Sequence, residues 1–206
     1  MIGIPLRLAL RHALHAAARV DGAIGGALFT LDESGAMLHL AAHLGLPEEI
    51  ARRGREVPAG DGTATGNAAT ERRRVVIRDV AGDEYGEHTA QVLALGIRAI
   101  QATPLISARR RVLGVLTTFY GTPHHPAPDS LRKIDLCCAI ATHLLELQSA
   151  SDIALPPSTL RDASDRSGAE AIRVLLPACA EQMNCDEAVL ATVERRLKEL
   201  PRGASG

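Results

Sequence analysis

The sequence predicts one α+β domain, in which an antiparallel sheet made of two hairpins is flanked by helices at both ends. Strand-like apolar runs occur in two pairs, each joined by a short polar turn, and helical patterns precede the first pair and follow the second. A length of 206 residues suits one domain with its own core and a small remainder. We expect a main domain over residues 1–148, a linker over 149–168 and a small helical extension over 169–206.

The first half reads as helix, hairpin, short helix. Pro5 suits the first turn of a helix, and Asp21 with Gly22 ends its apolar pattern. Gly35 supplies the tight reversal of the hairpin, and Pro47 opens the short helix. The expected elements are a helix over residues 5–19, strands over 25–31 and 37–44, and a helix over 47–53.

The middle of the chain begins with a segment rich in Gly, Ala and Thr over residues 58–70, which predicts a loop leading into a tightly packed helix. The segment contains no lysine, so it is not a phosphate-binding P-loop. Pro104 within a strand-like run indicates a bulge or an edge position. The further expected elements are a strand over 75–77, a helix over 87–95, a second hairpin of 99–106 and 112–120, and a long helix over 129–148.

The long helix carries two apolar stripes, so one covers the sheet and the other meets a further helix from this chain or from a second subunit. Residues 149–168 are polar and contain Pro156-Pro157, which is typical of a linker. Helical patterns then run from 169 to 183, interrupted by Pro177, and from 184 to 200. We expect this helical hairpin to dock on the main domain or on a neighbour.

Composition excludes several function classes. A net charge of -1 and only two Phe, two Tyr and no Trp argue against nucleic-acid binding. No apolar run approaches the length of a membrane span and no signal peptide is recognisable, so we expect a cytoplasmic protein that does not bind membranes. The four cysteines, Cys137, Cys138, Cys179 and Cys185, lack zinc or redox spacing and are expected to be buried free thiols.

Five phrases in a fixed order sharpen the fold prediction: GLPEE from Gly45, VPAGDG from Val57, VVIRDV from Val75, GIRAIQATPL from Gly96 and LGVLTTFY from Leu113. Residues 5–148 therefore resemble the GAF domains that accompany bacterial sensor histidine kinases. The resemblance implies an antiparallel sheet of five or six strands, with the terminal helices on one face and a small-molecule pocket on the other. It also implies homodimers built through the terminal helices.

The resemblance implies a sensory module of signal transduction that binds an unidentified small molecule, signals through its terminal helices to a histidine kinase or another signalling protein, and is not an enzyme. Catalytic cysteines of the GAF-type methionine sulfoxide reductases and the bilin cysteine of phytochromes have no counterpart before Cys137, so no cofactor is expected. The cyclic-nucleotide pattern does not follow Asn67, and no thiol occurs in Thr63–Gly66. The alternatives are a dimerisation or protein-interaction module with a degenerate pocket, and a GAF-type enzyme or haem carrier.

Polar and aromatic residues on the segments that line the family's pocket are the candidate ligand contacts. They are Phe29, Thr63, Asn67, Asp79, Tyr85, His88, Gln101, Thr103 and Thr117. Asp79 has an alternative role as the cap of the following turn. His39 and His43 are expected on one side of their strand, because strand side chains alternate with period two. The arginine triplets at 72–74 and 109–111 suit either solvated turns or an anionic ligand or partner.

Overall fold

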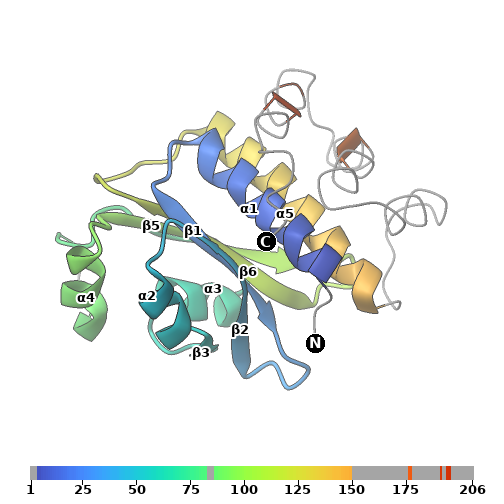
Figure 1. The fold of residues 1–206 in the computed structure, drawn as a ribbon, viewed down its shortest axis with the longest axis horizontal. Coiled ribbons are helices and arrows are strands. Elements are labelled where there is room, and N and C mark those ends of the chain that lie inside the picture. The colour runs from blue at the N-terminus through green and yellow to red at the C-terminus, as the bar shows by residue number, and fades with distance from the viewer. Residues whose placement is uncertain (1–3, 83–85, 150–175, 178–190, 192–193, 196–206) are drawn as a thin grey trace.

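The computed structural model describes residues 4–82, 86–149, 176–177, 191 and 194–195. Figure 1 shows a central sheet with a pair of helices on one side and shorter helices on the other. The helices are α1 (Ile4–Val20), α2 (Glu48–Arg53), α3 (Ala64–Glu71), the 3-10 turn η1 (Gly86–His88), α4 (Thr89–Ala94) and α5 (Pro128–Ser149). The strands are β1 (Gly25–Leu31), β2 (Met37–Leu44), β3 (Glu56–Pro58), β4 (Val75–Ile77), β5 (Ala99–Ile106) and β6 (Val112–Tyr120).

The sheet has six strands in the order β3-β2-β1-β6-β5-β4, and every neighbouring pair is antiparallel. Both predicted hairpins form, β1 with β2 and β5 with β6, and β1 pairs with β6 to join them. The predicted α+β class with a five- to six-stranded antiparallel sheet is therefore confirmed. None of the helices in the described ranges has the length and apolarity needed to cross a bilayer.

Helices α1 and α5 lie side by side across one face of the sheet (Figure 1). Leu10 and Leu14 of α1 meet both stripes of α5 and the sheet residues Leu28 and Leu116 in one aliphatic core. The second stripe of α5 thus finds its partner within this chain. Leu176, beyond the expected linker, is 1% exposed and belongs to the same core.

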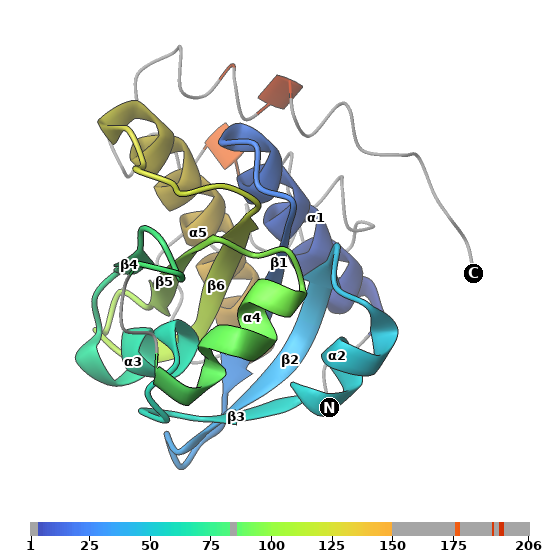
Figure 2. The same cartoon turned by 90° about the vertical axis from the view of Figure 1, so that its left-hand side faces the viewer.

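The opposite face of the sheet carries α3 and α4 (Figure 2). Helix α3 approaches β5, β6 and β4 closely, because alanines on both surfaces bring the two backbones near each other. Helix α4 makes no comparably close backbone approach to the sheet, and none of its residues is fully buried. Its Val92 and Leu93, with Leu95 just beyond it, are half-buried against the apolar cluster on this face. This side of the sheet is thus tightly covered by α3 and loosely covered by α4.

Most predicted elements form, and the differences have local causes. Strand β3 was not predicted, because three residues at a sheet edge show no periodicity. The helix predicted over 87–95 is a 3-10 turn followed by the six-residue α4. Pro104 lies on the part of β5 that β4 does not reach, so one side of the strand is open there, and a register shift follows at Leu105. Both features suit proline, which has no backbone N–H to donate to a neighbouring strand. The helical hairpin predicted over 169–200 lies almost entirely outside the described residues.

A β-bulge in β2 reverses the expected orientation of one histidine. The register shifts between Leu28 and Phe29, so that Ala41 is an extra residue opposite them. His39 pairs with Thr30, whose side faces away from the α3 cluster, whereas His43 pairs with Ala27, which belongs to that cluster. The two histidines therefore lie on opposite faces, and the prediction that they share a side was wrong.

Candidate ligand-binding site

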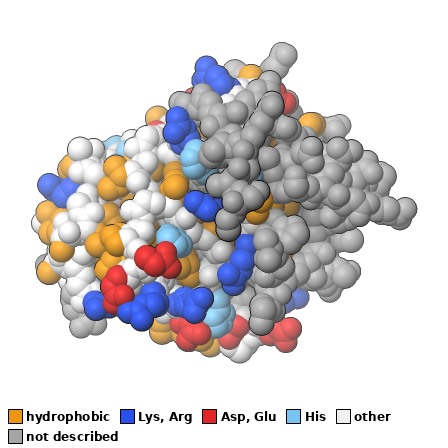
Figure 3. Space-filling view, viewed as in Figure 1, with side chains coloured by type: hydrophobic (Ala, Val, Ile, Leu, Met, Phe, Trp, Pro, Cys, Tyr) orange, Lys and Arg blue, Asp and Glu red, His pale blue; other side chains and the backbone are white. Residues whose placement is uncertain are grey.

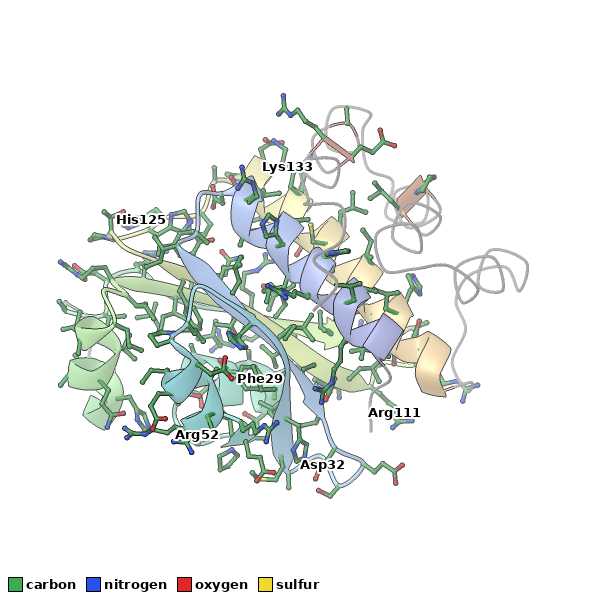
Figure 4. All side chains as sticks on the ribbon, viewed as in Figure 1. Phe29, Asp32, Arg52, Arg111, His125 and Lys133 are labelled. Atoms are coloured by element: carbon green, nitrogen blue, oxygen red, sulfur yellow. The ribbon has the colours of Figure 1, made fainter. Side chains whose placement is uncertain are left out.

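Small and apolar side chains form the floor of the site on the α3 face. Ala27, Ala102 and Thr117 come from adjacent strands in direct register, and all three are at most 1% exposed. Phe29 lies on the same face, 7% exposed, within the interior of the molecule on the side of α2 and α3 (Figure 4). The Thr117 hydroxyl lies 3.0 Å from the hydroxyl of Thr65 on α3. The floor is thus apolar with one partly buried hydroxyl pair.

The start of α3 is fixed by a compact set of hydrogen bonds. Thr63 caps the helix by accepting the backbone N–H of Gly66 at 3.0 Å, and its own hydroxyl donates to Asp61 Oδ1 at 2.6 Å. Asp61 Oδ1 also accepts the Thr63 backbone N–H at 2.9 Å. The Asn67 amide donates to the Gly62 carbonyl at 3.4 Å. Both predicted residues, Thr63 and Asn67, therefore hold the loop that precedes the helix.

Asp79 lies after β4 and binds Arg98 through both carboxylate oxygens, with N–O distances of 2.9 to 3.1 Å. It also accepts the backbone N–H of Ala81, so its alternative role as a turn cap is present. Hydrogen bonds from Arg98 hold the pKa of Asp79 below its usual value. This ion pair ties the β4–α4 connection to the start of β5. His88, half-buried, precedes α4 without capping it, and Tyr85 lies outside the described residues.

Gln101 and Thr103 lie on the opposite face of the sheet from Phe29 and Thr117. Ala102 shares the α3 face, so its two neighbours on β5 point to the α1 and α5 side. Thr103 pairs with Leu116 of the helix core and accepts a hydrogen bond from Arg74. The amide of Gln101 is buried with neither its oxygen nor its nitrogen partnered in the described part of the chain. The structure thus places these two predicted residues behind the sheet.

The Asp79 carboxylate is engaged by a guanidinium, and the described cysteines, Cys137 and Cys138, lie buried on α5 behind the sheet. Burial raises the pKa of the Cys137 thiol to about 12 and that of Cys138 well above its usual value, so neither is a thiolate nucleophile. Within the described ranges, no three His, Cys, Asp or Glu side chains converge as metal ligands.

A six-stranded antiparallel sheet with the terminal helix pair on one face is the fold that the sequence resemblance implied. The family model of the GAF domain matches residues 5–145. The chain belongs to the GAF domain family. GAF domains are sensory and regulatory modules of signalling proteins. No curated protein sequence matches the chain significantly.

Solved structures share the GAF fold at low sequence identity. A GAF domain/HD domain protein from Geobacter sulfurreducens is 15% identical, with a TM-score of 0.58 over 70% of this chain and 94% of that one. The GAF-B domain of DevS from Mycobacterium smegmatis is 20% identical, with a TM-score of 0.52 over 69% and 93%. A type II free methionine-R-sulfoxide reductase from Thermoplasma acidophilum is 13% identical, with a TM-score of 0.54 over 73% and 99%. At these identities the likeness shows the fold alone.

Two residues of this GAF domain that contact the candidate residues were not predicted from the sequence. Thr65 is the partner of the buried Thr117, and Arg98 is the partner of Asp79. Helical spacing offers a signal for Thr65, because it lies on the α3 surface between the buried Ala64 and Ala68. No local signal identifies Arg98, whose role depends on a contact with a residue 19 positions earlier.

Proposed function

We propose that this GAF domain is a regulatory module that binds a small molecule between the sheet, α3 and α4, and passes the binding event to α1 and α5. The observation that carries the proposal is the contrast between the two covers of this face. The alanines of α3 pack closely, while α4 contributes only half-buried apolar side chains. A helix with few buried contacts opens at low free-energy cost, which a ligand-binding lid requires.

The walls of this region favour a small ligand of low charge. Aliphatic and aromatic groups, including Phe29 and Val115, predominate, and the polar groups on the floor are the hydroxyls of Thr65 and Thr117. The nearby carboxylate of Asp79 is neutralised by Arg98. Mostly apolar walls with a few directed polar groups are the usual composition of small-molecule sites. We therefore expect an uncharged ligand with one hydrogen-bonding group directed at the threonine pair.

Strand β6 supplies a physical connection between the two faces. Thr117 faces α3, and its neighbours Leu116 and Thr118 face the terminal helices. Side chains of one strand are fixed to a common backbone, so a displacement at the floor also moves the groups that contact the helix pair. The output partner that we expect to read this change is a histidine kinase or another signalling protein, with the GAF domain acting as a homodimer.

Native mass spectrometry of the purified protein, compared with a denatured spectrum, tests the binding step. We expect a small-molecule mass bound to the folded protein. Thr117→Val removes the floor hydroxyl, and Thr118→Val is the matched control, since both threonines are buried and each hydroxyl has a hydroxyl partner, at 3.0 and 3.1 Å respectively. Loss of one hydrogen bond of about 1 kcal/mol lowers affinity about five-fold, so Thr117→Val retains less of the bound mass and Thr118→Val retains it all.

A dimerisation module is the second candidate function, and one surface observation favours it. Leu8 on α1 is 40% exposed, although its neighbours Ala9 and Leu10 are buried in the helix core. An exposed leucine beside a packed helix pair suits contact with a second copy. Sedimentation velocity combined with native mass spectrometry separates the candidates: an empty dimer that Leu8→Glu dissociates supports this function, and a ligand-loaded protein supports the first.

A further inference from the structure

A second hollow lies at the edge of β2, away from the site between the sheet, α3 and α4. It has a volume of about 270 Å³ and is bounded by α1, β2, α2 and the segment after α2. We call it the arginine pocket. Its lining residues are Arg7, Leu40, Ala41, Ala42, His43, Glu48, Ala51, Arg52 and Arg55. Figure 3 shows basic, acidic and histidine side chains gathered over α2 and β2 on this face of the molecule.

The pocket exists because the edge strand stops early. Strand β3 pairs with β2 only from Met37 to His39, and the last contact is the Leu40 N–H donating to the Arg55 carbonyl at 2.8 Å. β2 continues to Leu44, and its bulge at Ala41 falls where β3 has ended. A bulge leaves one residue outside the regular ladder and bends the strand. The remaining edge of β2 therefore faces the pocket, with α1 on one side and α2 on the other.

The charges in the pocket are unbalanced. Three guanidiniums and one carboxylate, that of Glu48, leave an excess of two positive charges. Neither Arg7 nor Arg55 has an ion-pair partner among the described residues. Arg52 contacts Glu49, but Glu49 is shared with Arg53, so this group keeps one net positive charge. Unbalanced guanidiniums around a hollow favour an oxyanion, whose oxygens match their paired N–H donors.

A buried polar atom at the wall is a second, independent observation. Nδ1 of His43 is buried and has no hydrogen-bond partner, while Nε2 lies 3.7 Å from a carboxylate oxygen of Glu48. Buried polar atoms without partners are rare in folded proteins, and each one needs an explanation. An anion bound in the pocket, to which the His43 ring turns and donates, supplies one.

We propose that the arginine pocket binds a small dianion, either a phosphate group or a dicarboxylate. The excess of two positive charges matches the charge of such a ligand. The volume is near the lower limit of about 300 Å³ for small-molecule sites, which restricts the occupant to a few heavy atoms. An anion held by Arg7 and Arg52 links the N-terminal helix α1 to α2, so the site acts on one of the terminal helices directly.

Thermal-shift titrations with inorganic phosphate and with succinate, each against sodium chloride at equal ionic strength, test the proposal. We expect at least one of the two dianions to raise the melting temperature saturably, and the responding anion identifies the phosphate or the dicarboxylate arm. Equal, non-saturating shifts with both dianions and with chloride overturn the proposal. Each melting temperature is compared with that of the same protein without added anion. Occupancy of the site between the sheet, α3 and α4 is then the same in both samples.

Two variants locate the binding. Arg7→Gln and Arg55→Gln each remove a guanidinium from the pocket and are expected to weaken binding about ten-fold or more, since hydrogen bonds to charged groups contribute about 1.5–3 kcal/mol. Arg53→Gln is the matched control, because Arg53 lies on the same helix as Arg52, pairs with Glu49 and does not line the pocket. All three residues are exposed, so the fold tolerates the changes. Equal weakening by Arg53→Gln contradicts the assigned location.

Discussion

Replacing Gly66 by alanine tests how the start of α3 is held, because helix propensity and the structure predict opposite signs. Alanine is favoured over glycine inside a helix by about 1 kcal/mol, so propensity alone predicts a more stable protein. A Cβ at position 66, however, meets the carboxylate oxygen Oδ1 of Asp61 at 2.2 Å and the carbonyl oxygen of Pro58 at 2.8 Å. Both separations are shorter than van der Waals contact, so the loop must move.

The size of the effect follows from the bonds that Asp61 makes. Its Oδ1 accepts the backbone N–H and the hydroxyl of Thr63, and a carboxylate displaced by the new methyl group loses both. Two such bonds at a partly exposed site, less the propensity gain, give a net loss of about 2 kcal/mol in the free energy of unfolding. Urea unfolding followed by circular dichroism measures it. Asn67→Ala, at the next position of the same helix, is the control and is expected to change stability by less than about 0.5 kcal/mol, because the gain in helix propensity offsets the loss of its long, exposed hydrogen bond to the Gly62 carbonyl.

A double variant separates the two contacts. In Asp61→Ala/Gly66→Ala the carboxylate is absent, so the new methyl group meets only the backbone of the loop, at the Pro58 carbonyl and the Asp61 N–H. We expect the double variant to lose less than the sum of the single changes, because the clash and the lost bonds share one side chain. A Gly66→Ala protein that is more stable than the wild type would refute the reasoning.

Three further outcomes are expected. Asp21→Ala costs about 1–3 kcal/mol in urea unfolding, since the largely buried carboxylate accepts the Ser130 hydroxyl at 2.7 Å and lies 2.8 Å from His124 Nε2. Cys137 and Cys138 resist iodoacetamide in the native protein, because their buried thiols have raised pKa values, and react after denaturation, as peptide mapping detects. Burial, with His15 and Arg11 nearby, lowers the pKa of His12; the unfolded state therefore binds more protons, and the stability contributed by neutral His12 is lost as pH falls below about 6.5. His12→Gln flattens that fall in unfolding curves, whereas an equally steep fall contradicts the assignment.

The regular elements could be predicted from the sequence because their signals are local. Both hairpins and the two terminal helices show clear periodicity and end at glycine, proline or polar turns, and the strands of both hairpins begin and end where expected. Strand β3 could not be predicted, because its three residues are recognisable as a strand only from their pairing with Met37–His39 of β2. The linker and the extension beyond residue 148 stay predictions.

The orientation of strand residues is the part that local patterns could not give. Strand β5 is buried on both faces along almost its whole length, so no alternation of polar and apolar residues tells which side Gln101 and Thr103 occupy. In β2 the alternation exists, but the bulge at Ala41 reverses it between His39 and His43. One additional residue changes the face of every later side chain, and nothing in the local sequence marks that position.

Local patterns also cannot identify side-chain contacts between residues that are far apart in the sequence. Thr117 was predicted as a pocket residue from its strand, and the structure places it on the α3 face; its contact with Thr65 spans 52 positions. Arg74 belongs to a triplet that suited a solvated turn, yet it is largely buried and bridges Thr103 and Asp135. The roles of both residues are decided by tertiary contacts.

The central claim is that a small molecule binds on the α3 face of the sheet. A crystal structure of the protein with its co-purified molecule, or with a hit from a fragment screen, tests this most directly. We predict electron density between the sheet, α3 and α4, in contact with Phe29 and with the hydroxyl of Thr117 or Thr65. Density confined to the arginine pocket or to the surface of α1 and α5, with the α3 face filled by the protein's own side chains, would contradict it.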